Sequence, residues 1–407
     1  MAIKWIFNKK AQTVDKKIPS LHFFSEEEVK KVRSFLSGFK EYQPTPLVSL
    51  DNLAKEIGVG KIWVKDESHR FGLNAFKVLG GSYAIGKYLS KKLGVDVTEL
   101  SFEKLRSKEI KEKIGELIFV SATDGNHGRG VAWAANRLGQ KSVIFMPKGT
   151  AQARLENIRK EGAQAEITDF SYDGAVKHAN RYAEENHGVM VQDTDWEGYT
   201  EIPTWIMQGY MAIADEISEQ LKAQDVEKPT HIFLQAGVGS FAAAIQGYYA
   251  AKFGAERPIS VIVEPENAAC VFKSALISDG KPHSIDGHLE TIMAGLCCGT
   301  PNTMGWHILR NYAHLFVSCP DYVSARGIRI LANPLGSDSK VVSGESGSVG
   351  LGLFSLLAQQ EKYQEVLDLL KINQKSKVLF ISTEGATDPV GYRRIVWDGY
   401  CPVPTDY

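Results

Sequence analysis

Lys77 stands in the segment ESHRFGLNAFKVLGG, where its neighbours predict an unusual environment for an amine. Asn74 is a typical helix N-cap, and Phe76, Leu79 and Tyr83 recur at helical spacing. The pattern predicts that Lys77 lies in the first turn of a helix, where the helix dipole and the apolar neighbours both disfavour an ammonium. A lysine whose pKa is lowered in this way can attack a carbonyl carbon. A lysine that extends into water from a partly buried helix has the same pattern.

Two glycine-containing turns each follow an apolar run and precede a helical pattern. The first is TDGNHGRG at 123–130, after LIFVSA, and the second is GVGS at 237–240, after HIFLQA. Glycines let backbone amides approach a ligand, and the start of a helix attracts an anion. The first turn suits a carboxylate and the second a phosphate, although ordinary strand-to-helix turns use the same residue types.

Carboxylates and hydroxyls follow two further apolar runs. Asp193 lies in QDTDWEGY after VMV, Ser382 and Thr383 begin STEG after VLFI, and Glu345 opens the glycine-spaced segment ESGSVG. Each segment alone is also explained by helix caps and turn hydrogen bonds. The chain has neither a dinucleotide-binding GxGxxG with its acidic partner nor a GxxxxGK[ST] loop, which favours a smaller phosphorylated ligand.

Short β-branched or apolar runs alternate with helical patterns, as in parallel βαβ units. We expect helices at 128–138 and 208–221 and a charge-rich surface insertion at 97–116. The expected strands are 61–65, 117–121, 142–146, 190–192, 231–234, 259–263 and 378–381. Ligands of open parallel sheets lie beyond the carboxyl ends of the strands, where all four polar segments fall.

Composition limits the function classes. The 407 residues exceed what one hydrophobic core usually organises, and 47 basic against 48 acidic residues leave no charge footprint for nucleic acid or an anionic membrane. We see no signal peptide and no membrane-spanning run, so we expect a soluble cytoplasmic protein. The five cysteines form no CxxC pair and lack histidines at metal-ligand spacing, so we expect buried thiols and no metal; the sequence does not select a disulfide pair.

A reactive lysine, a phosphate cradle and neutral hydroxyls together suit pyridoxal 5′-phosphate. The lysine forms a Schiff base with its aldehyde, the cradle anchors its phosphate, and a residue beside the pyridine nitrogen tunes its electron demand. A hydroxyl at that nitrogen leaves it unprotonated, and the weaker electron sink suits β-elimination better than transamination.

The chain resembles the diaminopropionate ammonia-lyase family, within the fold type II (tryptophan synthase β-like) pyridoxal-phosphate enzymes. The resemblance covers nearly the whole chain. It rests on the segments YQPTPL, KDES, RFGLNAFK, TDGNHGRGVAWAA, MPKGTAQ, QDTDWEGYTEIPTWIMQGY, QAGVGS, IMAGLCCG and SGESGSVGLG.

The resemblance implies an α/β fold of two open, mainly parallel sheets flanked by helices, with the cofactor in the cleft between two domains. It implies a larger cofactor-binding domain made of 1–82 and 201–407, a smaller inserted domain at 83–200, and a homodimer. Lys77 would be the Schiff-base lysine, Asn126 would bond the cofactor's 3′ oxygen, and Thr383 or Ser382 would face the pyridine nitrogen. The remaining cofactor-binding residues would be Gly237, Val238, Gly239, Ser240 and Glu345.

The implied reaction is α,β-elimination of D- or L-2,3-diaminopropionate to pyruvate and two ammonia. Asp124, where most relatives carry Ser or Thr, would bind the second ammonium and relay a proton. Lys77 would take the α-proton from one face and Asp193 the α-proton of the D-isomer from the other. The substrate-binding residues would be Thr123, Asp124, Gly125, His127 and Asp193.

Three alternatives remain open at this point. A serine or threonine dehydratase or a β-replacement synthase of the same fold would not need Asp124. A non-catalytic ligand sensor would not need an intact lysine and cradle, and an NAD-dependent oxidoreductase would need the missing dinucleotide fingerprint.

Overall fold

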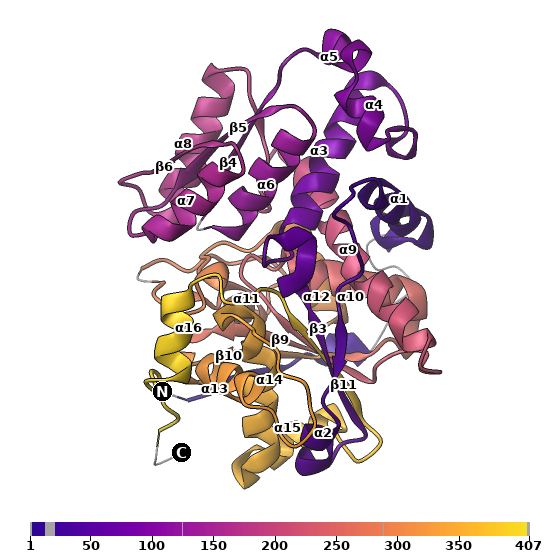
Figure 1. Cartoon of the computed structure of the whole chain (residues 1–407). Coiled ribbons are helices and arrows are strands. Elements are labelled where there is room, and N and C mark those ends of the chain that lie inside the picture. The colour runs from indigo at the N-terminus through magenta and orange to yellow at the C-terminus, as the bar shows by residue number, and fades with distance from the viewer. Residues whose placement is uncertain (1, 13–20, 124, 288, 405–407) are drawn as a thin grey trace. The chain divides into compact units, whose positions relative to one another are not determined.

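The computed structural model describes residues 2–12, 21–123, 125–287 and 289–404, which form two compact units (Figure 1). Unit 1 consists of Met1–His22, Pro44–His69 and Ile213–Tyr407, and unit 2 consists of Phe23–Gln43 and Arg70–Ala212. Helix α9 (Glu201–Lys222) begins in unit 2 and ends in unit 1. No helix among the described residues has the length and apolar character that crossing a membrane requires.

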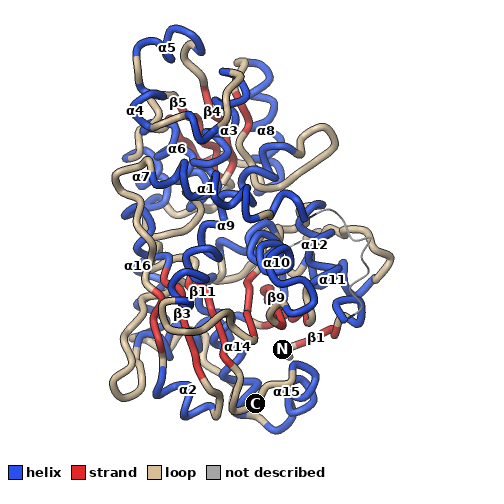
Figure 2. Tube along the Cα trace, turned by 90° about the vertical axis from the view of Figure 1, so that its right-hand side faces the viewer, coloured by secondary structure: helices blue, strands red, loops and turns tan. Residues whose placement is uncertain are grey.

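Unit 1 contains a seven-stranded sheet in the order β1-β10-β9-β8-β11-β3-β2, and Figure 2 shows β3 beside β11 in this sheet. Only the edge strands β1 and β2 pair antiparallel to their neighbours. The strands are β1 (Lys4–Phe7), β2 (Leu47–Ser49), β3 (Lys61–Asp66), β8 (His231–Gln235), β9 (Ile259–Pro265), β10 (Leu315–Cys319) and β11 (Lys377–Ser382). Every residue of β8 and β10 is buried, as in a parallel sheet with both faces covered.

The helices of unit 1 cover this sheet. They are α2 (Asp51–Ile57), α10 (Ser240–Phe253), α11 (Cys270–Ile277), α12 (Thr303–Tyr312), α13 (Asp321–Ala332), α14 (Glu345–Gln359), α15 (Gln364–Leu370) and α16 (Pro389–Val396). At the centre of the core, the rings of Phe233, Phe354 and Phe380 lie with centroids 5.3–5.7 Å apart. These aromatic contacts connect α14 to β8 and β11, the strands that lead into two of the polar segments.

Unit 2 contains a fully parallel four-stranded sheet in the order β6-β5-β4-β7. Its strands are β4 (Ile118–Ala122), β5 (Lys141–Met146), β6 (Gln164–Ile167) and β7 (Val189–Met190). Its helices are α1 (Glu26–Ser37), α3 (Val78–Leu93), α4 (Phe102–Arg106), α5 (Lys108–Ile114), α6 (Asn126–Arg137), α7 (Gln152–Lys160) and α8 (Tyr172–Glu185). The small side chains of Ala175, Ala179 and Ala183, one turn apart, let α8 pack closely on this sheet.

The predicted fold class is confirmed, and each of the seven expected strands is present within one or two residues. Four strands were not predicted: the short edge strands β1 and β2, the half-exposed β6, and the buried β10. The segment 97–116 lies mostly exposed at the surface, as expected, and it folds into short helices that include α4 and α5 and bury Leu105, Ile110 and Ile114.

The predicted start of the helix at Lys77 is wrong in its details. Asn74 is not the N-cap, since it adopts a left-handed conformation with φ of 62°, and α3 begins at Val78 with Lys77 as its N-cap residue. Phe71 and Gly72 are left-handed as well, with φ of 51° and 72°. The segment is therefore a tight turn, a role in which asparagine is as common as in helix caps.

Candidate active site

In unit 2, Lys77 and Asp193 form a close ion pair. The Lys77 Nζ lies 2.6 Å from Asp193 Oδ2, and the two side chains are 20% and 3% exposed. Lys77 comes from the start of α3, and Asp193 comes from the segment that follows β7. The pairing joins residues 116 positions apart. The resemblance implied that both residues serve one site, on opposite faces of the cofactor, but it did not predict their direct contact.

Glycines let the helices around Lys77 approach one another closely. A Cβ on Gly80 of α3 would lie 2.6 Å from the Tyr210 ring of α9, and a Cβ on Gly130 of α6 would lie 2.7 Å from the Val78 Cα. Such distances are shorter than any normal contact between carbon atoms. The backbone that carries Lys77 is therefore fixed by two packed helices.

A tyrosine fixes the strand end that carries Asp193. The Tyr199 hydroxyl donates to the Met190 carbonyl at 3.0 Å and accepts from the Gln192 backbone N–H at 2.8 Å. The Gln192 side chain donates to the Tyr172 hydroxyl at 2.8 Å. Because these bonds are buried or partly buried, they hold the backbone on the N-terminal side of Asp193 in one conformation.

The electrostatic environment keeps Asp193 ionised. Burial alone would raise the pKa of its carboxyl, but the positive charges of Lys77 and His127 outweigh burial and lower this pKa to about 2. The His127 ring is 3% exposed, and its Nε2 lies 2.9 Å from the Val191 carbonyl. A carboxylate stabilises a neighbouring ammonium in return, whereas we expected from the apolar neighbours that this ammonium would be disfavoured.

The TDGNHG turn lies at the carboxyl end of β4, as predicted. Thr123 is buried and its hydroxyl accepts from the Gly125 N–H at 2.9 Å, while Asn126 is the first residue of α6. Asp124, the predicted partner of the second ammonium, lies outside the described residues. Sequence reasoning missed Arg154 of α7, whose side chain lies 3.3 Å from the position of a Cβ on Gly125 and adds positive charge beside the turn.

In unit 1, the GVGS segment, the predicted phosphate cradle, lies at the start of a helix. Gly239 is the N-cap of the 14-residue helix α10 and has φ of 94°, a conformation that favours glycine. The Val238 carbonyl accepts from the Asn302 N–H at 2.7 Å, which fixes the turn. A Cβ on Gly237 would lie 3.2 Å from the Leu296 Cα, so a larger residue would disturb the loop beside it. The N–H groups at the start of α10 suit an anion.

The hydroxyls at the end of β11 differ in their hydrogen bonds. The Gln235 side chain donates to Thr383 Oγ1 at 2.8 Å and to the Ile381 carbonyl at 2.9 Å. Since Thr383 accepts this bond, its own proton is available for an acceptor such as an unprotonated pyridine nitrogen. The Ser382 hydroxyl instead donates to the Glu384 carbonyl at 3.3 Å. The geometry therefore favours Thr383 over Ser382 as a cofactor contact.

The start of α14 presents a further buried hydroxyl. Glu345 begins the helix and is buried, and the next residue, Ser346, donates its N–H to Glu384 Oε1 at 3.3 Å. The Ser346 hydroxyl is buried and has no hydrogen-bond partner in the part of the chain that the structure describes. It lies 3.0 Å from the position of a Cβ on Gly295. A buried polar atom without a protein partner is expected where a polar ligand binds, so these residues fit a pyridine ring with polar substituents.

The cysteines and the possible metal-ligating side chains are arranged as follows. Cys270 and Cys319 are buried, the other three cysteines are half-buried, and all five are free thiols. Within residues 2–12, 21–123, 125–287 and 289–404, no three His, Cys, Asp or Glu side chains are grouped as metal ligands.

Comparison with known proteins agrees with this chemistry. The model of the family described as "Pyridoxal-phosphate dependent enzyme" matches residues 39–374. The diaminopropionate ammonia-lyase of Salmonella typhimurium strain LT2 is 51% identical over 370 residues, which are 91% of this chain and 92% of that protein.

Solved structures of the Escherichia coli diaminopropionate ammonia-lyase have the same fold. One is a complex with an aminoacrylate-PLP azomethine reaction intermediate; its TM-score is 0.89 at 46% identity, with 98% of each chain covered. Another is a complex with D-serine; its TM-score is 0.91 at 46% identity, with 99% of each chain covered.

Proposed function

Because the chain belongs to the diaminopropionate ammonia-lyase family of pyridoxal-phosphate dependent enzymes, we propose that it cleaves 2,3-diaminopropionate and water into pyruvate and two ammonia. The observation that carries this proposal is the partly buried Lys77–Asp193 ion pair, 2.6 Å long, in a chain 51% identical to a named ammonia-lyase over nine-tenths of its length. An amine and a carboxylate so placed can exchange a proton directly.

The residues of unit 1 fit the polar groups of the cofactor. The N–H groups of residues 237–240 would hold its phosphate, and the Thr383 hydroxyl would donate to its pyridine nitrogen, with Glu345 and the Ser346 hydroxyl nearby in the same unit. When bound, pyridoxal phosphate withdraws electrons from the substrate's α-carbon and so acidifies the α-proton. A hydroxyl donor leaves that nitrogen without a full positive charge, which suits elimination.

The residues of unit 2 would move the protons. Lys77 Nζ would hold the cofactor's aldehyde and take the α-proton of the L-isomer, and Asp193 Oδ2 would take the α-proton of the D-isomer. The Asn126 side chain would bond the cofactor's 3′ oxygen. Asp124 would bind the second ammonium, because an amine leaves only in protonated form and needs a proton source within reach.

Two measurements on the purified protein test this proposal. The first is the visible absorbance of bound cofactor. The second is the release of pyruvate and ammonia from D-diaminopropionate, L-diaminopropionate and serine, assayed in parallel. We expect two ammonia per pyruvate from diaminopropionate and much slower release from serine. Faster turnover of serine would instead identify a dehydratase, and absence of cofactor would contradict both readings.

Three statements remain predictions, two implied by the resemblance and one, the location, inferred from the sequence. We propose that the enzyme is a homodimer, that it works in the cytoplasm, and that residues 83–200 form the smaller domain. Sedimentation equilibrium of the holoenzyme tests the first, since a monomer at micromolar concentration would contradict it.

A further inference from the structure

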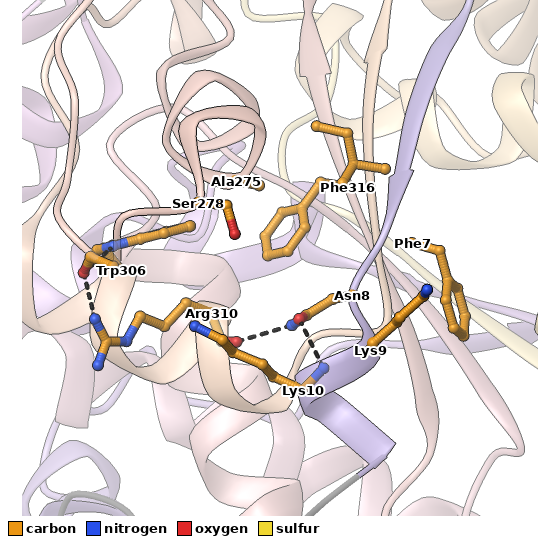
Figure 3. Close-up of a pocket in the computed structure, with 11 residues that line it drawn as sticks. Phe7, Asn8, Lys9, Lys10, Ala275, Ser278, Trp306, Arg310 and Phe316 are labelled. Atoms are coloured by element: carbon orange, nitrogen blue, oxygen red, sulfur yellow. Dashed lines mark hydrogen bonds between the residues drawn. The ribbon is translucent and has the colours of Figure 1, made fainter.

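A cavity of about 250 Å³ lies in unit 1, apart from the cradle residues (Figure 3). It is open to solvent and is lined by residues of the N-terminal strand β1, the short helix η1 (Lys9–Gln12), α11, α12 and β10. At about 30 Å³ per water, its volume corresponds to roughly eight water molecules, or a ligand of about eight or nine non-hydrogen atoms.

Three cationic residues contribute to the lining of this cavity. Lys9, Lys10 and Arg310 all line it, and no aspartate or glutamate is among its described lining residues (Figure 3). Clefts whose charges have one sign attract ions of the other. The lining therefore favours an anionic ligand.

Arg310 is fixed in place with a donor to spare. Its guanidinium donates through Nη1 to the Gly280 carbonyl, which also accepts from Trp306 Nε1 at 3.1 Å. Gly280 has φ of 86°, and a Cβ there would lie 2.7 Å from Arg310 Nη1. The Arg310 Nε is buried and has no acceptor among the residues that the structure describes. The guanidinium has further N–H groups besides Nη1–H and Nε–H, and its charge favours an anion nearby.

Part of the cavity lining is apolar. Trp306, Phe316 and Ala275 contribute to it, from α12, β10 and α11 respectively (Figure 3). Inorganic phosphate would leave this surface facing water, whereas an organic acid would cover it. The lining thus suits a carboxylate attached to a small apolar body.

Helix α12 connects this cavity to the phosphate cradle. The N-cap residue of α12, Asn302, donates its N–H to the Val238 carbonyl, and a Cβ on Gly305 would lie 3.4 Å from the Gly239 carbonyl carbon. Arg310 lies in the last turn of the same helix, about 12 Å further along its axis. The Asn8 side chain donates to the Arg310 carbonyl at 2.8 Å, so the N-terminal segment also contacts this end.

We propose that this cavity is an effector site for a small organic carboxylate with an apolar body, and that its occupancy changes how tightly the cradle holds the cofactor phosphate. The carboxylate accepts from the Arg310 guanidinium, and Lys9 and Lys10 add positive charge beside it. This proposal can be tested independently of the proposed reaction, because ligand binding is measured without turnover.

Calorimetric titration of the holoenzyme with benzoate tests the site, with neutral benzamide and inorganic phosphate as comparison ligands. We expect saturable binding of one benzoate per chain, weakened roughly ten- to a hundredfold by Arg310→Gln, since hydrogen bonds to charged groups have that value. Lys9→Gln should weaken binding less and reduce its salt dependence, and Lys340→Gln, an exposed lysine of the same unit outside the cavity, should leave it unchanged. Benzamide and phosphate should bind much more weakly.

Ala275→Phe keeps every charge and fills the cavity, so it decides the question even if Arg310→Gln disturbs folding. It should abolish benzoate binding. Binding that survives both substitutions, or equal binding of benzamide, would overturn the site. The rate of cofactor loss, followed by absorbance, should change at least twofold when benzoate is present, and this change should vanish in Ala275→Phe. Binding with no change in that rate would overturn the connection through α12.

Discussion

Asp193→Asn separates the two proton acceptors that we propose. The substitution keeps the size of the side chain and removes its charge beside Lys77. Asp193 is ionised at any working pH, because burial acts to raise its pKa but the charges of Lys77 and His127 lower it to about 2. General-base catalysis contributes about a hundred- to ten-thousandfold to a rate. Turnover of D-diaminopropionate should therefore fall by that factor, and turnover of the L-isomer by less than about tenfold.

The assay is pyruvate release from each isomer at saturating substrate, with cofactor content checked by absorbance. Asp195→Asn is the matched control, since it removes the same charge two residues away in the same segment. It should leave both activities close to those of the unchanged chain. Equal losses on both isomers in Asp193→Asn would refute the assignment of one base to each isomer. A loss confined to the L-isomer would reverse it.

Three further predictions follow from single contacts. Tyr199→Phe removes the hydroxyl that bonds Gln192 and should lower kcat for the D-isomer more than it raises KM, with a stability loss of about 1–3 kcal/mol measured by urea unfolding. Thr383→Val should shift the absorbance of bound cofactor and lower kcat about tenfold, whereas Ser382→Ala should do neither. Burial raises the pKa of Glu264 from 4.5 to about 8, so between these pH values the native state keeps a proton that the unfolded chain releases. The free energy of unfolding should therefore fall by up to about 5 kcal/mol as the pH rises through this range. The Glu264→Gln variant should not show this fall.

The sequence predicted the buried centre of each sheet better than its edges. Strands such as β8 and β11 are continuous apolar runs because both of their faces are covered, and such runs are recognisable without any structure. Strands β1 and β2 are only three or four residues long and half-exposed, so their pairing partners, not their composition, make them strands. The buried β10, however, is a largely apolar run whose composition is typical of a strand.

The site shows the same division between local and tertiary information. The turn at 237–240 was predictable because a glycine before a helix is a local signal, and Gly239 has the left-handed conformation that this turn needs. The contact between Lys77 and Asp193 depends on the packing of α3 and on the Tyr199 hydrogen bonds, which no spacing in the sequence reveals. Asn74 illustrates the opposite error, because its residue type suits a cap and a turn equally well.

In the proposed reaction, the charge of Lys77 would control how strong a base Asp193 is. While Lys77 is an ammonium, its charge and that of His127 outweigh burial, and Asp193 is a weak base with a pKa of about 2. Burial is nevertheless the largest single influence on this carboxyl, and it acts to raise the pKa. Removing the charge of Lys77 would shift this balance toward burial, raise the pKa of Asp193 and so make its carboxylate a stronger base.

Lys77→Met isolates this effect, because it removes the charge and keeps an apolar chain of similar length. We expect the pKa of Asp193 to rise well above 2, measured by difference infrared titration of the carboxylate band against Lys77→Met/Asp193→Asn. Because a carboxyl whose native pKa is lowered adds stability only above that pKa, Lys77→Met should also move the acid unfolding midpoint to higher pH. A carboxylate that still titrates near pH 2 in Lys77→Met would show that hydrogen bonds, not the ammonium, keep it ionised, and Lys77 would then have no control over its basicity.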